Sequence, residues 1–299
     1  MHIVYISGGF GNQLFQIGFY NYLSKNNPNV YLNIDFYNYQ YKILYTIIRK
    51  FRKTPIRKFH FNEHFKKNIL SSKELLIQLS KINRFKAFIF YLLIIFLPTN
   101  KVLKFLKFNL INENNFNTSL IQFNKFIFFD GYWQDFKFIE NEISYVRNLL
   151  IQYKYFNPES FFKNQIIIHV RRGDFTNSLI SNIYTTLDSY YYDKALFEIT
   201  KLERKNFNII VCSDDIEWCK KYITSITHFK NIKYSDSNNL QTDFKLIAES
   251  EFIISSNSTF CWWASIVGNS KAVIIPKNWY TQKHVKTQFI SQFDKILEI

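Results

Sequence analysis

The second half of the chain alternates short apolar runs with amphipathic segments. The apolar runs have the length of buried strands, which are expected at Gln165–Val170, Asn206–Cys212, Asn231–Tyr234, Phe252–Ser255 and Lys271–Ile275. Apolar positions at helical spacing predict helices over Tyr190–Arg204, Ile216–Thr224, Gln241–Ser250 and Ser258–Val267. Because strands that alternate with helices form βαβ units, this half is expected to build a parallel sheet covered on both faces.

The first half shows the same alternation more weakly. Strands are expected at His2–Ile6, Asn29–Asp35 and Phe126–Asp130, with a helix from about Gln13 and another over 136–151. Residues 40–125 are irregular and helical in places. The whole pattern predicts an α/β fold with two Rossmann-like domains facing a cleft. The first, residues 1–157, carries an irregular helical insertion, and the second is residues 158–299.

Composition excludes several classes of protein. With 7 glycines and 5 prolines in 299 residues, the chain has no long linker or low-complexity tract. Its three cysteines, Cys212, Cys219 and Cys261, form neither a disulfide framework nor a C-x-x-C zinc motif. The sequence runs from Met1 directly into a strand without a signal-peptide pattern, so a cytoplasmic location is expected.

The formal net charge of +15 suits nucleic acid, an anionic membrane surface or a phosphorylated small molecule as partner. Basic residues gather at Arg49–Lys53 and Arg57–Lys58, and a further group brackets the apolar run Ala87–Leu97. That run is too short to cross a bilayer as a helix, which needs about 20 residues. Two interpretations of residues 84–108 stay open. They form either a buried helix with solvated ends or a segment that rests on the anionic inner face of a membrane.

Three of the glycines lie between the first strand and the first helix. Gly8, Gly9 and Gly11 allow a tight turn and a close approach of the backbone to a ligand. The following helix would offer free N–H groups to a phosphate, and Asn12 and Gln13 add side-chain donors. The spacing is neither the dinucleotide G-x-G-x-x-G nor a P-loop. A turn without a ligand is the open alternative.

The segment His169-Val-Arg-Arg-Gly-Asp-Phe175 follows the strand at 165–170. Arginine binds phosphate oxygens in a bidentate manner and keeps its charge, so Arg171 and Arg172 suit a pyrophosphate. The two side chains of adjacent residues point in different directions, and Asp174 is available to hold one of them. The alternative is a structural Arg–Asp pair on a solvated loop.

Two further strand ends carry polar residues. The segment Ser255-Ser-Asn-Ser-Thr-Phe-Cys-Trp-Trp-Ala264 opens a helix, where hydroxyl and N–H groups can hold an anion or simply cap the helix. Trp262 and Trp263 are expected in the core. In Val211–Ile216, Asp214 can accept hydrogen bonds from a nucleoside, or an aspartate there can cap the helix that begins at Ile216.

In this order along the chain, the motifs resemble the α-1,2-fucosyltransferase family that uses GDP-fucose, in its bacterial branch. The resemblance runs from residue 4 to about 276 and is weakest over 40–125. It departs from the usual pattern at Cys261, where serine is common, and at Leu14, where methionine is common. The matching segments are Gly8–Gln16, Gly131-Tyr-Trp-Gln134, His169–Asp174, Ser213-Asp-Asp-Ile-Glu-Trp-Cys219 and Ser256–Ala264.

The resemblance implies a GT-B-type glycosyltransferase that moves L-fucose from GDP-β-L-fucose to the 2-hydroxyl of a terminal galactoside with inversion. Arg171 would hold the β-phosphate and Arg172 would support it. Asn12 would reach the fucose and the acceptor. The implied donor-binding residues are Gly9, Gly11, Gln13, His169, Arg172, Asp214, Asn257, Ser258 and Thr259. A cytoplasmic enzyme that touches the inner membrane face would suit the assembly of a surface polysaccharide such as O-antigen or capsule.

No cofactor and no metal ion are expected. The chain contains no D-x-D pair, which metal-dependent glycosyltransferases usually show, and cationic side chains can neutralise the diphosphate instead. The segment His60-Phe-Asn-Glu-His64 fits H-x-x-E-H but lacks a helical context and a third ligand. The general base must lie within hydrogen-bond reach of the acceptor hydroxyl, and the sequence gives no distances. Asp174, Asp135, His169 and Asn12 are the candidates, of which Asp174 is preferred.

Two alternative functions remain. One is a fucosyltransferase of another linkage, acting on protein or on N-acetylglucosamine. The other is a basic nucleic-acid-binding Rossmann protein, which the net charge favours. Against it, the basic clusters lie in the first half of the chain, away from the phosphate-type motifs, so no nucleic-acid partner is expected. The acceptor glycan and the oligomeric state have no signature in the sequence.

Overall fold

A computed structural model describes residues 1–39, 46, 56–118, 125–173, 183–202, 206–223, 228–229, 231–235, 239–281 and 296–299. The chain divides into two compact units, Met1–Glu142 and Ile143–Ile299. The sequence boundary at 157 differs from this division by one helix, α8 (Ile143–Gln152). Helix α8 contacts α13 (Thr259–Val267) of the second unit, where Arg147 Nε donates to the carbonyl of Val267 at 2.9 Å.

The first unit contains a parallel four-stranded sheet in the order β2-β1-β4-β3. Its strands are β1 (His2–Tyr5), β2 (Val30–Asn33), β3 (Leu110–Ile111) and β4 (Ile127–Phe129). Its helices are α1 (Phe10–Ser24), α2 (Asp35–Tyr39), α4 (Ser72–Ile82), α5 (Arg84–Leu93), α6 (Thr99–Phe105) and α7 (Phe136–Ile139), with short 3-10 turns η1 (Glu113–Asn115) and η3 (Glu140–Glu142). The central strand β1 is flanked by β2 and β4, so its carboxyl end is a point where strand order reverses.

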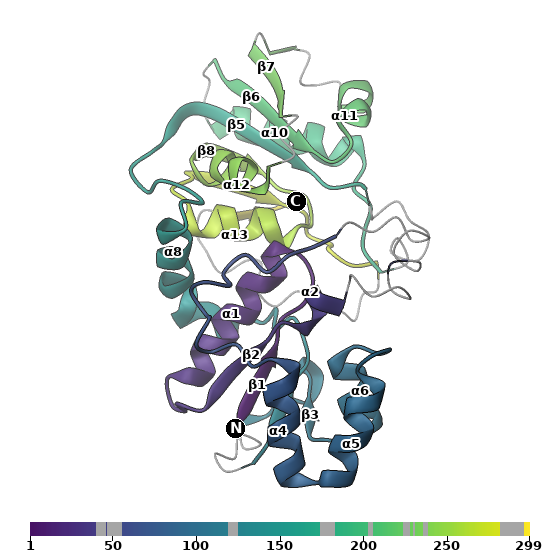
Figure 1. Cartoon of the computed structure of the whole chain (residues 1–299). Coiled ribbons are helices and arrows are strands. Elements are labelled where there is room, and N and C mark those ends of the chain that lie inside the picture. The colour runs from purple at the N-terminus through teal and green to yellow at the C-terminus, as the bar shows by residue number, and fades with distance from the viewer. Residues whose placement is uncertain are drawn as a thin grey trace. The chain divides into compact units, whose positions relative to one another are not determined.

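Helices α4, α5 and α6 cover one part of this unit with their inner faces (Figure 1). Leu75, Leu79, Phe90 and Leu103 are buried there, in one cluster with Ile3 of β1. The start of α4 is fixed by a capping box, in which Ser71 accepts from the backbone N–H of Glu74 and the Glu74 carboxylate accepts from the N–H of Ser71.

The second unit contains a parallel six-stranded sheet in the order β10-β9-β8-β5-β6-β7. Its strands are β5 (Phe162–Val170), β6 (Asn208–Ser213), β7 (Asn231–Ser235), β8 (Ser250–Ile254), β9 (Ala272–Ile275) and β10 (Ile296–Glu298). Its remaining helices are α10 (Ser189–Leu202), α11 (Ile216–Tyr222) and α12 (Leu240–Ala248). Because β5 lies between β6 and β8, its carboxyl end is the topological switch point of a Rossmann sheet, where ligands collect.

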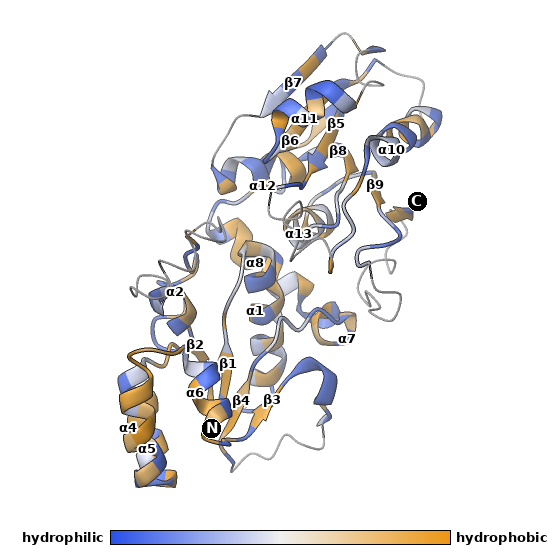
Figure 2. Ribbon diagram, turned by 90° about the vertical axis from the view of Figure 1, so that its right-hand side faces the viewer, coloured by the Kyte–Doolittle hydropathy of each residue, from blue (hydrophilic) through white to orange (hydrophobic). Residues whose placement is uncertain are grey.

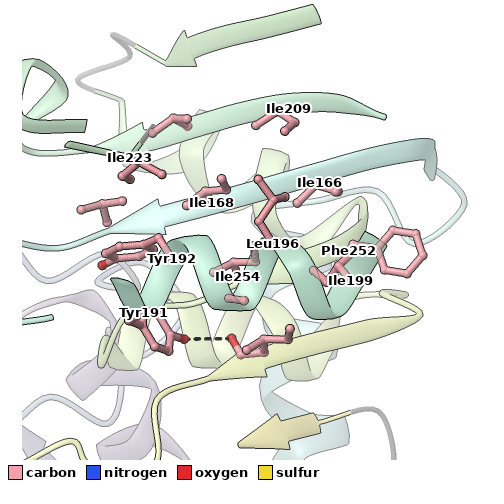
Figure 3. Close-up of a cluster of buried hydrophobic side chains, with 14 of the residues drawn as sticks. Ile166, Ile168, Tyr191, Tyr192, Leu196, Ile199, Ile209, Ile223, Phe252 and Ile254 are labelled. Carbon is pink, nitrogen blue, oxygen red and sulfur yellow. Dashed lines mark hydrogen bonds between the residues drawn. The ribbon is translucent and has the colours of Figure 1, made fainter. Parts of the chain in front are cut away.

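Both faces of the second sheet are covered (Figure 1). Successive residues Ile166, Ile167 and Ile168 of β5 are all fully buried, which requires cover on both sides because side chains alternate between faces. Helix α10 packs Tyr192 and Leu196 against one face (Figure 3), and α12 contacts β5 and β8. The structure thus confirms the predicted α/β class and the two Rossmann-like units.

The structure refines several predicted elements. Helix α1 begins at Phe10, three residues before the expected start, so Gly11, Asn12 and Gln13 are helical and not part of the loop. The single helix predicted over 136–151 is interrupted, because α7 ends at Ile139 and α8 begins at Ile143. Within the described residues, no helix has the length and apolar character needed to cross a membrane.

Candidate active site

Residues that follow β5 and β8 meet at the switch point of the second sheet. The backbone N–H of Ser256 donates to the carbonyl of His169 at 3.0 Å, and His169 Nδ1 lies 2.9 Å from Ser256 Oγ. Parallel neighbours end at the same edge, which is why residues 87 positions apart come together. Two of the predicted motifs therefore form one local structure.

The His169 ring carries no charge at neutral pH. Burial, together with the smaller effect of the nearby positive charge of Arg171, lowers its pKa to about 4. A group with so low a pKa is a weak general base near pH 7. His169 therefore serves as a neutral hydrogen-bonding side chain that shapes the edge of the sheet.

Asp214 binds both arginines of the motif after β5. Its Oδ2 lies 3.0 Å from Nη1 of Arg171, and its Oδ1 accepts from the backbone N–H of Arg172 at 2.8 Å. Asp214 follows β6, which pairs with β5, so the contact joins the ends of adjacent strands. The Arg171 side chain keeps 32% of its surface exposed, so part of it faces solvent.

Arg172 is less exposed than Arg171 and has neighbours on three sides. Its guanidinium lies 3.9 Å from the ring centre of Trp218, its Nε lies 3.5 Å from Asp215 Oδ2, and its Nη1 lies 3.4 Å from the carbonyl oxygen of Leu187. Asp215 also caps α11 by accepting from the N–H of Trp218 at 3.1 Å. The sequence prediction that an aspartate caps this helix is confirmed for Asp215, while Asp214 pairs with Arg171.

The start of α13 presents hydroxyl groups beside the arginine loop. Ser258 occupies the N-cap position without a side-chain capping bond, and both Ser258 and Thr259 are partly exposed. Asn257 is buried, and its amide donates to the carbonyls of Thr185 at 2.8 Å and Trp279 at 3.0 Å. Asn257 thus ties two loops to the end of β8, while the next two residues are partly exposed. As expected, Trp262 and Trp263 are buried.

The glycine loop of the first unit has the tight geometry that the sequence predicts. Gly8 has a φ of +80°, a conformation that favours glycine, and a Cβ there would meet the side chains of Asn12 and Tyr132. At Gly9 a Cβ would collide with the guanidinium of Arg57. Tyr37 donates to the carbonyl of Gly8 at 3.3 Å. Gly9 therefore allows Arg57 to lie directly over the loop.

Two amide side chains join the end of β1 to the end of β4. Gln16 accepts from the N–H of Ser7 at 3.0 Å and donates to the carbonyl of Gly131 at 2.8 Å. Gln134 donates to Oδ1 of Asn12 at 2.9 Å. Asn12 is thereby placed at the carboxyl edge of the first sheet.

Gln13, one of the predicted donor-binding residues, is buried inside the first unit. Its Nε2 donates to the carbonyl of Lys58 at 2.8 Å, and its Oε1 accepts from the N–H of His60 at 3.3 Å. The other predicted residue of this helix, Gly11, is also buried. Both residues therefore support the loop from within α1.

The carboxylates near Gly131 are largely occupied. Asp135 caps α7 through the N–H of Lys137 at 3.1 Å and pairs with the Lys137 ammonium at 2.7 Å. Glu113 accepts from the N–H of Trp133, and burial raises its pKa. Asp130 accepts from Asn100 at 3.0 Å, and burial raises its pKa as well.

Some predicted residues lie outside the described part of the chain. Asp174, the preferred base, is one of them, as is the basic cluster Arg49–Lys53. Among the described residues, no group of three or more His, Cys, Asp or Glu side chains could hold a metal ion. The histidines of the H-x-x-E-H segment pack their rings against phenylalanines, His60 against Phe10 and His64 against Phe65.

Sequence reasoning missed several residues that build these two edges. Asp215 and Trp218 hold Arg172, and Gln16 bridges β1 and β4. Each of these residues lies inside a motif that the sequence analysis recognised, but the motif did not indicate which contact the residue makes. Arg57 was noted only as part of a basic cluster, and nothing in the spacing along the chain predicts that it lies against Gly9.

Several solved structures show distant similarity to this chain. The NodZ α-1,6-fucosyltransferase soaked with GDP-fucose has 12% sequence identity and a TM-score of 0.41, covering 91% of this chain and 93% of that one. POFUT1 in complex with GDP has 11% identity and a TM-score of 0.39, covering 90% and 96%. A family 9 glycosyl transferase from Veillonella parvula has 8% identity and a TM-score of 0.37, covering 92% and 80%.

Sequence comparison is more specific. An α-1,2-colitosyltransferase from Escherichia coli is 27% identical over 303 residues, which cover 94% of this chain and 93% of that protein. The family pattern "Glycosyl transferase family 11" matches residues 3–295, and thus both units with all the motifs described above. The chain belongs to glycosyl transferase family 11.

Proposed function

We propose that this glycosyltransferase moves L-fucose from GDP-β-L-fucose to the 2-hydroxyl of a terminal galactoside, with inversion and without a metal ion. The observation that carries the proposal is the partly exposed side chain of Arg171, oriented by Asp214 at the switch point of a Rossmann sheet. Family membership and the α-1,2 linkage in the name of the Escherichia coli relative support the reaction class.

The reaction is a single displacement at the anomeric carbon. The acceptor 2-hydroxyl oxygen forms a bond to that carbon from the face opposite the diphosphate, while the bond from carbon to phosphate oxygen breaks. The electron pair of this bond leaves with GDP, and the hydroxyl proton passes to a base. Because negative charge grows on the leaving oxygen, a preorganised cation next to it lowers the barrier.

The second unit supplies the charge for the departing diphosphate. In the proposal, Arg171 contacts the β-phosphate, and Arg172 fixes the loop through its own contacts with Asp215 and Trp218. The hydroxyl groups of Ser258 and Thr259 donate hydrogen bonds to the diphosphate. The free N–H groups of the first turn of α13 do the same. These donors together can neutralise the diphosphate, so we propose that no divalent cation is needed.

The resemblance implies that Asp214 contacts the nucleoside, but the proposal gives it a different role. Both of its carboxylate oxygens already accept bonds from the arginine loop. We therefore assign Asp214 to positioning Arg171. Asn257 and His169 act in the same indirect way, through the loops and the Ser256 hydroxyl that they hold.

The first unit supplies the contacts to the sugar and the acceptor in this proposal. Asn12, held by Gln134, and Arg57, which lies over Gly9, are the polar groups at its sheet edge. Asp174 stays the preferred general base. Among the other candidates His169 is neutral with a pKa of about 4, and Asp135 is paired with Lys137.

The test includes GDP-activated colitose as a second donor, because the Escherichia coli relative is named for colitose. Purified protein is incubated with GDP-fucose or GDP-activated colitose and with galactosides, N-acetylglucosaminides and a peptide acceptor, with and without EDTA. Linkage is assigned by NMR. The proposal predicts an α-1,2-fucosylated galactoside whose yield EDTA leaves unchanged.

Each other outcome corrects one part of the proposal. A colitose product alone changes the donor, a product on N-acetylglucosaminide or peptide changes the acceptor, and loss of activity with EDTA removes the metal-independent mechanism. Nucleic acid is not expected as a partner of a family 11 glycosyltransferase. A cytoplasmic location and a role in surface-glycan assembly stay predictions.

A further inference from the structure

The outer side of α5 and of the turn after it is apolar and exposed. Phe85 and Phe88 expose 73% and 59% of their surface, and Phe96 exposes 63%. We call this surface the apolar ridge, and its members are Phe85, Phe88, Tyr91, Leu92, Ile95 and Phe96. Figure 2 shows α5 coloured as hydrophobic along most of its length. An amphipathic surface helix would turn polar residues outward, so this helix departs from the usual pattern.

The inner side of the same helix is also apolar. Ala87 and Phe90 are buried in the cluster with Leu79 and Leu103, which accounts for the fold of the segment. The ridge residues Phe85, Phe88 and Leu92 recur at intervals of three and four on the other side. The sequence-based interpretation of a buried helix is thus wrong for this outer face, and no contact among the described residues accounts for its apolar character.

Charge around the ridge is of one sign. The segment 75–112 contains six basic residues and no aspartate or glutamate. They lie on α4, α5, α6 and the following turn, and all but the half-buried Lys86 are exposed: Lys81, Arg84, Lys86, Lys101, Lys104 and Lys107. The ridge therefore lies beside a row of cations from its own segment, two of which, Lys101 and Lys104, also lie near the partly buried Asp130 of another segment.

We propose that the apolar ridge and its basic rim rest on an anionic lipid bilayer. A helix of ten residues is about 15 Å long, too short to cross the hydrocarbon core, so it lies in the plane of the interface. The ridge side chains enter the boundary between headgroups and acyl chains, and the long lysine and arginine side chains reach anionic headgroups.

Other occupants fit the surface less well. A second copy of this chain would bring the same cationic rim against itself, so like charges would oppose the contact. A nucleic acid backbone would pair with the cations but would leave the aliphatic side chains of Leu92 and Ile95 in water. An anionic bilayer satisfies both the apolar and the basic part. This inference is independent of which sugar and acceptor the enzyme uses.

The first test is flotation of the whole protein with vesicles of equal parts phosphatidylcholine and phosphatidylglycerol, compared with phosphatidylcholine alone. We expect binding to the anionic vesicles that weakens as salt rises. The variant F85S/F88S should bind at least about tenfold more weakly, since two large apolar side chains no longer leave water. The variant K101Q/K104Q should bind more weakly and lose part of the salt dependence.

Phe197 supplies the matched control, because it is an exposed phenylalanine on α10 of the second unit. F197S should bind vesicles like the unchanged protein. All variants should keep the same unfolding temperature and the same activity on a short water-soluble acceptor. Equal vesicle binding by F85S/F88S and by the unchanged protein would overturn the proposal, as would equal binding to neutral and anionic vesicles.

A second measurement locates the contact without removing it. F88W carries a tryptophan on the ridge, and F197W carries one on α10. Brominated acyl chains should quench the additional fluorescence of F88W and leave that of F197W unchanged. Sedimentation without lipid checks the remaining occupant. A dimer that F85S/F88S abolishes would make the ridge an interface between copies and refute the membrane assignment.

Discussion

Asp214 Oδ2 lies 3.0 Å from Nη1 of Arg171, at the ends of two adjacent strands. Both side chains are partly exposed, so this ion pair adds little to the stability of the fold. The ion pair matters because it orients the Arg171 side chain, which would otherwise sample many conformations. The guanidinium is then held where negative charge develops on the leaving diphosphate, so it need not reorganise during the reaction.

Asp214→Asn should therefore reduce kcat and leave KM for the donor nearly unchanged. The amide can still accept from the N–H of Arg172, but it no longer holds Arg171 by charge. We expect a loss of about tenfold, comparable to one charge-assisted hydrogen bond. Steady-state kinetics measure it. Glu217→Gln is the control, since the exposed Glu217 pairs with Lys220 on α11.

Arg171→Ala should lower kcat by a factor on the order of 10²–10³, the usual loss when one group that stabilises a leaving charge is removed. Arg171→Lys should recover only part of it, because lysine offers no planar fork to a phosphate. Lys201→Ala, an exposed cation on α10, should leave activity unchanged. An Arg171→Ala enzyme of normal activity would contradict the proposed site.

Gly8→Ala should lower the stability of the protein, whereas Gly9→Ala should lower its activity. At Gly8 the φ of +80° makes alanine unfavourable, so the free energy of unfolding should fall by about 1–2 kcal/mol. At Gly9 the backbone is ordinary, but the new methyl group displaces the guanidinium of Arg57. That variant should keep its stability within about 0.5 kcal/mol and lose activity.

Comparison with Arg57→Ala identifies the cause of that loss. If Gly9→Ala acts only by displacing Arg57, the double variant should be no less active than Arg57→Ala alone. Additive losses would show that the loop backbone itself contacts the substrate. Denaturant unfolding and initial rates provide the two readouts.

Stability should fall as the pH drops from about 6.5 towards 4, and His169 should account for part of the fall. Burial lowers the pKa of His169 to about 4, so the unfolded chain binds a proton in this range and the folded chain does not. The penalty is absent above pH 6.5 and approaches about 3 kcal/mol at the lower end.

His169→Gln should flatten this pH dependence of the free energy of unfolding, because glutamine does not titrate. His228→Gln, at an exposed position, should leave the slope as it is. Urea unfolding at a series of pH values gives the measurement. An unchanged slope in the His169 variant would show that this ring is already accessible to protons in the folded protein.

The sequence predicts the second unit well, since its strands are continuous apolar runs and each ends in a recognisable polar motif. Those ends were expected at one edge, and His169 and Ser256 do meet there. The pairing of Arg171 with Asp214 was not predicted, because spacing along the chain does not say which carboxylate faces which cation. Asp174, the predicted general base, lies outside the described residues, so its role stays a prediction.

The first unit was predicted less well, for two physical reasons. The start of α1 was placed too late because Gly-Phe-Gly-Asn has low helix propensity, whereas burial of Phe10 and Gly11 in the folded unit favours a helix there. The region 40–125 contained a readable signal that was overlooked, the capping box from Ser71 to Glu74. The exposed side of α5 could not be inferred, because an apolar helix looks the same in sequence whichever face is covered.

The hydrogen bonds between His169 and Ser256 also have a consequence for synthesis. The two residues are 87 positions apart, and ribosomes add about 5–20 residues per second, so the second partner emerges on the order of ten seconds after the first. Until then the arginine loop has no neighbouring strand on one side. The proposed diphosphate site of a growing chain therefore stays incomplete until Ser256 has been synthesised and β8 has paired with β5.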